Sequence, residues 1–176
     1  MVGPPHSGKS VFLAALVTAL KARGGKFFLH RACPDGEGMW SAESAPETVS
    51  AIRRKGGFTP GFLAFTCQAI DGLAKCFPLV LVDCGGRRSG ENAEILRHCT
   101  HAVVLSSQPM ETAAWAEFCQ ANGCAVIGRI GSSLETEESL MIFGQDVFGG
   151  HLYGLDRSGI PAGTATQISR VAGFLG

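Results

Sequence analysis

The stretch Gly3-Pro4-Pro5-His6-Ser7-Gly8-Lys9-Ser10 has the form G-x-x-x-x-G-K-[ST] and leads directly into an apolar segment. Gly3 and Gly8 permit backbone conformations in which successive N–H groups surround phosphate oxygens. Lys9 brings a compact positive charge to the β- and γ-phosphates, and the Ser10 hydroxyl is a Mg²⁺ ligand. The helix expected next directs its positive N-terminus at the same anion. All eight residues are therefore predicted to bind a nucleoside triphosphate.

A second segment supplies the carboxylate that such a site needs. Residues 77–83 form an apolar run that ends in Asp83, as a buried parallel strand would, and Cys84-Gly85-Gly86 follows. Asp83 is expected to hold Mg²⁺, usually through water, because this cation prefers oxygen ligands and keeps several waters. The spacing places the Gly86 N–H near the γ-phosphate. An ordinary turn at a strand end is the alternative interpretation.

Together these segments resemble the P-loop NTPase superfamily. The loop looks superficially like that of AAA-type ATPases, but Cys84 stands where those proteins usually carry a water-polarising Glu. The D-x-G-G ending is closer to the kinase–GTPase branch. Gly128-Arg129-Ile130-Gly131 stands where GTPases carry their guanine-reading N-K-x-D motif, which favours ATP over GTP. The resemblance implies Mg²⁺ and ATP as cofactors, with Lys9 and Asp83 taking part in catalysis.

Two further segments carry candidate catalytic groups. Asp35 stands with Glu37 just beyond the second expected strand, where P-loop kinases often place a base that faces the acceptor hydroxyl. The alternative is a surface turn, because Pro-Asp-Gly favours turns. Arg87 and Arg88 follow the Asp83 strand and could reach phosphoryl charge in the transition state. An exposed loop pair is the alternative for the two arginines.

Residues 31–41, together with the phosphate-binding loop, are similar to the P-loop domain found fused to ring-nuclease-type domains in CRISPR-associated proteins. The resemblance implies a role in type III antiviral signalling through cyclic oligoadenylates. It also implies a ring-nuclease-type partner domain, fused or separate, and is compatible with an oligomer.

Composition narrows the classes of fold, partner and compartment that remain open. A chain of 176 residues fits one domain, 1–176, and 45% hydrophobic against 17% charged residues argues against disorder. A formal charge of zero disfavours direct nucleic-acid binding. The most apolar run, residues 11–20, is shorter than the ~20 residues of a membrane-spanning helix. Seven cysteines without a C-x-x-C pair indicate core residues in a reducing, cytoplasmic compartment.

Apolar runs alternate with helical patterns, which predicts a three-layer α/β/α fold with a parallel sheet. Only Met1 and Val2 precede Gly3, so the first strand of this sheet is expected to be truncated. The domain is also compatible with a fragment of a longer protein. Trp115 is expected in the core, and Thr164 as the N-cap of the last helix. Helices are expected over residues 10–23, 46–55, 61–75, 91–99, 111–121 and 164–175, and strands over 26–32, 77–83, 101–106, 124–130 and 151–155.

Three functions remain open from the sequence. A Mg²⁺-dependent hydrolase and a small-molecule kinase would use the same loop and the same carboxylate. A non-catalytic nucleotide switch that controls an attached domain or an oligomer is the alternative from a different class.

Overall fold

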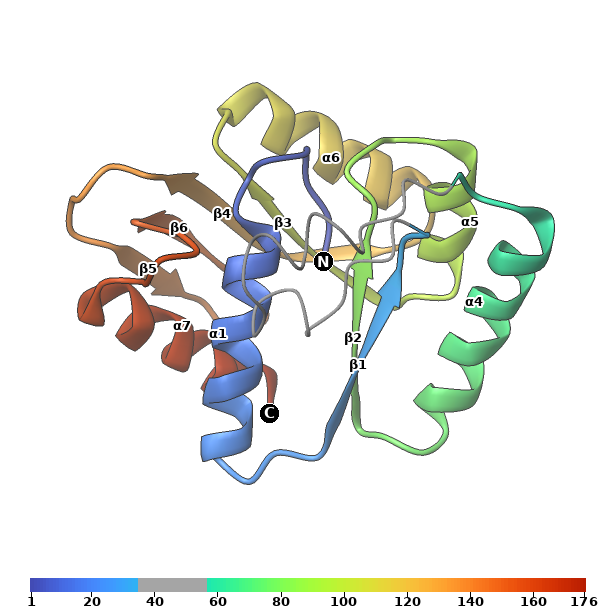
Figure 1. Cartoon of the computed structure of the whole chain (residues 1–176), viewed down its shortest axis with the longest axis horizontal. Coiled ribbons are helices and arrows are strands. Elements are labelled where there is room, and N and C mark those ends of the chain that lie inside the picture. The colour runs from blue at the N-terminus through green and yellow to red at the C-terminus, as the bar shows by residue number, and fades with distance from the viewer. Residues whose placement is uncertain (35–56) are drawn as a thin grey trace.

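A mostly parallel sheet lies between two layers of helices in this computed structural model, which describes residues 1–34 and 57–176 (Figure 1). The predicted α/β/α class is confirmed. The helices are α1 (Lys9–Ala22), α4 (Pro60–Ala74), α5 (Gly90–Arg97), α6 (Pro109–Ala121) and α7 (Ala162–Leu175). The strands are β1 (Phe27–Ala32), β2 (Leu79–Cys84), β3 (His101–Ser106), β4 (Ala125–Ser133), β5 (Leu140–Phe143) and β6 (Phe148–Tyr153).

The strands form two hydrogen-bonded groups, β1-β2 and β3-β4-β6-β5. All neighbours are parallel except β5, which runs antiparallel to β6. Parallel strands need crossover connections, and the helices that supply them cover both faces of the sheet. The carboxyl ends of the parallel strands therefore meet at one edge, where the loops that follow them are available to form a site.

Met1 and Val2 join the two groups of strands. The Met1 ammonium donates to the Val82 carbonyl at 2.7 Å, and the Cys84 N–H donates to the Met1 carbonyl at 3.1 Å. On the other side, the Val2 N–H donates to the Val103 carbonyl at 2.9 Å, and the Leu105 N–H donates to the Val2 carbonyl at 3.0 Å. These two residues thus occupy a strand position between β2 and β3.

Two apolar cores lie on opposite faces of the sheet. One contains Val2 and side chains of α4, α5 and α6, including Trp115, which is 1% exposed and packs edge-on against Phe118. The predicted core position of Trp115 is confirmed. The other core contains Phe12 and Leu16 of α1 together with side chains of α7. Helix α1 is apolar nearly all round, and its buried side chains share one core with α7 and with Leu105 and Ile130 of the sheet.

Sequence patterns located most of these elements, and the differences have local causes. β5 was not predicted. β6 begins at Phe148, earlier than expected, because the glycines of β6 resemble a turn. A Cβ on Gly150 would lie 2.0 Å from the Leu140 carbonyl oxygen, so the close approach of β5 and β6 requires glycine. The polar helix expected over residues 46–55 lies outside the described residues.

The predicted N-cap at Thr164 is wrong. Helix α7 begins at Ala162 with Pro161 at the N-cap. The Thr164 hydroxyl donates instead to the Tyr153 carbonyl at 2.7 Å and pairs with the Ser139 hydroxyl at 2.6 Å. Its side chain therefore anchors α7 to the end of β6, a tertiary role that local sequence does not reveal.

The cysteines follow the prediction only in part. Cys67, Cys84, Cys119 and Cys124 are buried, whereas Cys76 is exposed, and all seven cysteines are free thiols. Burial raises the pKa of the Cys84 thiol to about 12, which makes it unreactive at neutral pH. No group of three or more His, Cys, Asp or Glu side chains in the described part of the chain is arranged to hold a metal ion.

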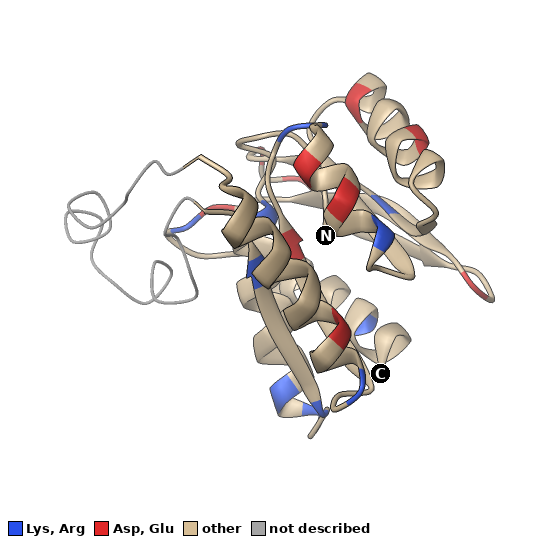
Figure 2. Cartoon of the chain, turned by 90° about the vertical axis from the view of Figure 1, so that its right-hand side faces the viewer, with Lys and Arg blue, Asp and Glu red and all other residues tan. Residues whose placement is uncertain are grey.

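Charged side chains of both signs are scattered over the helices and loops (Figure 2), in keeping with the zero formal charge. Within residues 1–34 and 57–176, none of the helices combines the length and apolar character needed to cross a membrane.

Candidate phosphate-binding site

The loop between Val2 and α1 has unusual backbone conformations, which its two glycines permit. Gly3, His6 and Gly8 all have positive φ, at 144°, 60° and 84°. A Cβ on Gly3 would lie 1.9 Å from the Leu105 carbonyl oxygen, so this position requires glycine for both conformation and space. Gly8 is the left-handed residue immediately before α1. The loop thus turns directly into the helix N-terminus, where unpaired backbone N–H groups favour an anion.

Lys9 lies across this loop. Its Nζ donates to the Gly3 carbonyl at 2.8 Å and to the Pro4 carbonyl at 2.7 Å. Burial lowers the pKa of Lys9, while the nearby Asp83 carboxylate acts in the opposite direction. The ammonium is therefore held at the loop by the backbone itself. Ser10, the other predicted phosphate-site residue at this point, is half-buried in the first turn of α1.

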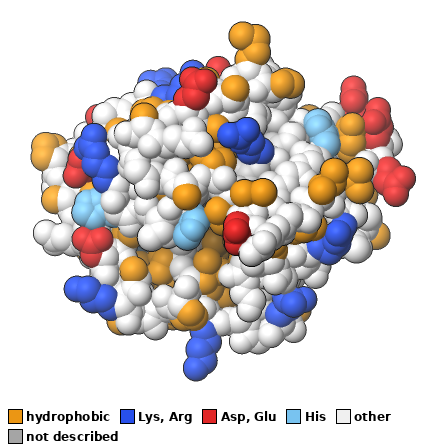
Figure 3. All heavy atoms as spheres, turned by 180° about the vertical axis from the view of Figure 1, so that it is seen from behind, with side chains coloured by type: hydrophobic (Ala, Val, Ile, Leu, Met, Phe, Trp, Pro, Cys, Tyr) orange, Lys and Arg blue, Asp and Glu red, His pale blue; other side chains and the backbone are white. Residues whose placement is uncertain are grey.

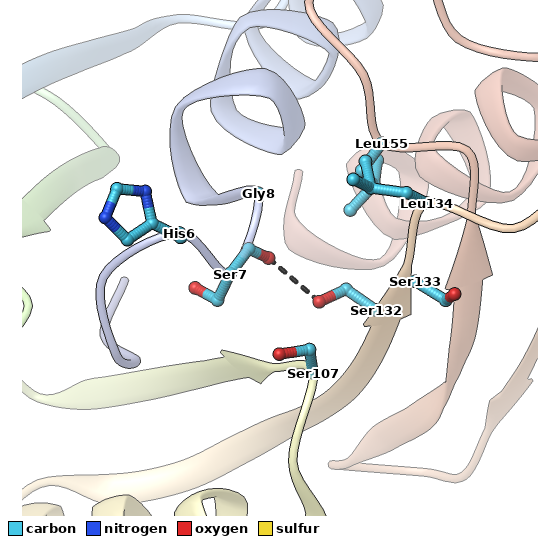
Figure 4. Close-up of a pocket in the computed structure, with 8 residues that line it drawn as sticks. All are labelled: His6, Ser7, Gly8, Ser107, Ser132, Ser133, Leu134 and Leu155. Atoms are coloured by element: carbon cyan, nitrogen blue, oxygen red, sulfur yellow. Dashed lines mark hydrogen bonds between the residues drawn. The ribbon is translucent and has the colours of Figure 1, made fainter.

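A serine from a distant strand fixes the loop. The Ser132 hydroxyl of β4 donates a hydrogen bond to the Ser7 carbonyl at 2.8 Å (Figure 4). The Ser7 hydroxyl donates to the Pro4 carbonyl at 2.9 Å. Both serines are buried. Sequence reasoning missed Ser132, because a serine near the end of a strand gives no signal of a partner 125 residues away.

A small cavity of about 60 Å³ lies beside the loop (Figure 4). In Figure 4 the serine side chains gather on one side of the loop, and the His6 ring extends away from them. Ligand pockets usually measure about 300–1,000 Å³, so this cavity borders the phosphate loop without having room for a whole nucleotide. It is lined by His6, Ser7, Gly8, Ser107, Ser132, Ser133, Leu134 and Leu155.

Asp83 lies at the carboxyl end of β2 and forms an ion pair with Arg31, its register partner at the end of β1. The residue is only 4% exposed, and burial raises the pKa of its carboxyl group. The Arg31 guanidinium, the N-terminal ammonium and Lys9 oppose that shift by favouring the charged form. The ion pair was not predicted, because the strand register that brings the two side chains together is not visible in the sequence.

Gly86 lies directly against the phosphate loop, as its predicted role requires. A Cβ at this position would be 2.9 Å from the Pro5 nitrogen. The turn that carries Gly86 is held by the buried side chain of Asn92, whose Nδ2 donates to Gly85 O at 3.2 Å and to Arg87 O at 2.7 Å. Asn92 is a second site residue that sequence reasoning missed.

The two arginines after this turn differ in their surroundings. Arg87 is exposed. Arg88 forms an ion pair with Glu111 at 2.6 Å, and its guanidinium lies 5.6 Å from the centre of the Trp115 ring. Its side chain therefore packs against α6. Asp35, the predicted base, lies outside the described residues together with Glu37.

One of three comparisons with known proteins bears on the fold. No protein-family model matches the chain, and no curated protein matches it. Among solved structures, it is similar to the septum site-determining protein MinD from Pyrococcus horikoshii OT3 in complex with Mg-ADP, with a TM-score of 0.58 at 12% sequence identity. The similarity covers 96% of this chain and 74% of that one. The chain therefore shares the fold of that protein.

Proposed function

We propose that this chain is a Mg²⁺-dependent nucleotide-binding domain and that the loop formed by residues 3–10 takes the phosphates of ATP. The observation that carries the proposal is Lys9 Nζ, held at 2.8 and 2.7 Å from two carbonyls of the loop that precedes α1. A mobile lysine on a surface helix would make no such contacts. A phosphate placed at the helix N-terminus would meet this ammonium and the loop N–H groups together.

The residues present also suit a magnesium ion. Asp83 offers a carboxylate and Ser10 a hydroxyl, the oxygen ligands that Mg²⁺ prefers. When bound, the ion would neutralise charge on the phosphates. Arg31 occupies one Asp83 oxygen, so it also sets the orientation of this carboxylate.

Cys84 bears on whether the chain would hydrolyse ATP rapidly. It stands directly after Asp83, and its thiol has a pKa raised to about 12 by complete burial. A neutral buried thiol cannot polarise an attacking water as a glutamate would. This favours a slow hydrolase or a kinase, with Arg87 as the exposed cation able to approach phosphoryl charge. The non-catalytic switch remains the alternative function.

Mass-resolved turnover of Mg-ATP by the purified chain tests these functions, first alone and then with a pool of nucleosides, nucleotides and cyclic oligoadenylates. ADP and free phosphate without an acceptor identify a hydrolase, and a phosphorylated acceptor identifies a kinase. Bound but unconsumed ATP identifies the switch. A role in type III CRISPR signalling with a ring-nuclease-type partner requires that oligoadenylates bind or alter turnover, and no effect at all would contradict it.

Replacing Asp83 with asparagine should remove most of the Mg²⁺ dependence of nucleotide binding. Loss of even an outer-shell partner costs about 10–100-fold in metal affinity, and asparagine keeps the size of the side chain while removing its charge. Nucleotide titrations with Mg²⁺ and with EDTA should then give nearly equal affinities. Asp146→Asn, in an exposed turn, is the matched control and should retain the difference. An undiminished Mg²⁺ effect in Asp83→Asn would remove this residue from the metal site.

If the chain is a kinase, Asp35→Asn should abolish phosphoryl transfer and leave ATP affinity unchanged. A base removes the acceptor proton in the transition state and contributes about 10²–10⁴-fold to the rate, without holding the nucleotide. Transfer and binding are measured on the same preparation, with Asp146→Asn as the control for a lost surface charge. Normal transfer by Asp35→Asn to the identified acceptor would show that another group is the base.

A further inference from the structure

Three charged side chains meet at the carboxyl ends of β1 and β2. Arg31 and Asp83 are register partners, each one residue before the end of its strand. Side chains alternate between the two faces of a sheet, so this pair shares its face with Leu29 and Leu81, which pack against the core that contains α1. Lys9 is the first residue of α1, and its charge interacts with both partners of the pair.

The ion pair between Arg31 and Asp83 is largely shielded from solvent. The Asp83 side chain is 6% exposed and the Arg31 side chain 25%, and Arg31 Nη1 donates a hydrogen bond to Asp83 Oδ2. Figure 3 shows other lysine and arginine side chains spread over the exposed surface at the back of the molecule, where water and salt screen them. Charges at the end of β2 are screened much less, so each of them has a strong effect on the others.

The balance of charge among these side chains favours an anion over a lone cation. Two positive side chains, Lys9 and Arg31, stabilise the one negative charge of Asp83. A divalent cation that arrived by itself would add to this positive excess, and repulsion between like charges is large where the effective dielectric constant is low. The phosphates of a nucleotide bring several negative charges and reverse the balance.

We propose that Arg31 is a positioning residue that makes Mg²⁺ binding at Asp83 depend on nucleotide phosphates. Its guanidinium holds one carboxylate oxygen and neutralises the charge that would otherwise attract a free cation. This inference rests on the proposed nucleotide-binding function, because the phosphates supply the negative charge that allows the metal to bind. The chain therefore takes up Mg²⁺ together with ATP or after it, and does not hold the metal alone.

Titration of the full chain with Mn²⁺, without nucleotide, tests this proposal by the electron paramagnetic resonance signal of the free ion. Mn²⁺ prefers the same oxygen ligands as Mg²⁺. Arg31→Gln should bind Mn²⁺ about tenfold or more tightly than the parent chain, because Asp83 loses its main counter-ion. Asp83→Asn in the same variant should abolish the gain. Arg97→Gln, which removes an exposed ion pair with Glu94, is the matched control and should behave as the parent does.

Two further measurements keep the test valid if Arg31→Gln folds poorly, since removing one partner of a buried pair is destabilising. Arg31→Lys keeps the charge and should bind Mn²⁺ as weakly as the parent. Mg²⁺ alone should leave the Tm of the parent unchanged, whereas Mg²⁺ added with ATP should raise it above the value with ATP and EDTA.

Tight Mn²⁺ binding by the parent without nucleotide, or a gain in Arg31→Lys equal to that in Arg31→Gln, would overturn the proposal. A parent chain that binds no ATP would instead contradict the proposed function. The two failures are distinguishable, because the Mn²⁺ titrations contain no nucleotide.

Discussion

Replacing Lys9 with alanine is expected to lower the affinity for ATP by about a hundredfold or more. The ammonium lies across the loop and would exchange its two carbonyl contacts for phosphate oxygens. Hydrogen bonds to charged groups contribute about 1.5–3 kcal/mol each, so the loss of two corresponds to at least two powers of ten in the dissociation constant. Titration of the variant with a fluorescent ATP analogue measures the change.

The fold should survive this substitution, because the carbonyls of Gly3 and Pro4 can turn to water when Lys9 is removed. Circular dichroism and the Tm check that expectation. Lys21→Ala, an exposed lysine in the last turn of the same helix, is the matched control and should bind ATP normally. Unchanged ATP affinity in a folded Lys9→Ala variant would contradict the proposed function as a whole.

The second large effect is expected at Gly3. An alanine there would place its Cβ 1.9 Å from the Leu105 carbonyl oxygen, at a φ of +144° that side chains rarely adopt. The neighbouring atom is backbone, so it cannot rotate away. Overpacking and backbone strain each cost about 1–3 kcal/mol, and together they should lower the free energy of unfolding by about 2–6 kcal/mol. Urea unfolding measures this loss.

Gly163→Ala is the control for the loss of a glycine. This residue lies in the first turn of α7, and a Cβ added to it would meet no other atom within 4 Å. Alanine should therefore be neutral there or stabilise the helix by up to about 1 kcal/mol. If Gly3→Ala unfolded at the same urea concentration as the parent chain, the loop would not have the close approach to β3 described above.

The parts of the site that were predictable are those encoded by contiguous residues. The eight-residue loop and the Asp83 strand each carry a local pattern that predicts a phosphate or metal site, and their shared position at one sheet edge follows from parallel topology. Their roles in nucleotide binding stay predictions. Gly86 followed from its fixed spacing to Asp83. The fold class followed from the alternation of apolar strands with helical segments, which the structure confirms.

The parts that were not predictable depend on tertiary contacts. Ser132 meets Ser7 across 125 positions of the sequence, and Arg31 meets Asp83 across 52. Asn92 supports the Gly86 turn from the next helix, where it looks like any polar helix residue. In each case the polar side chain is common and its partner is set by strand register or helix packing, which no local pattern specifies.

The place of Val2 and Gly3 in the sheet has a consequence for the order in which the protein is made. These residues leave the ribosome long before their partners at Val103 and Leu105, which are more than a hundred positions later in the chain. At about 5–20 residues per second, Val2 waits several seconds for β3. The phosphate loop that follows Val2 therefore cannot take its final shape until β3 has been synthesised.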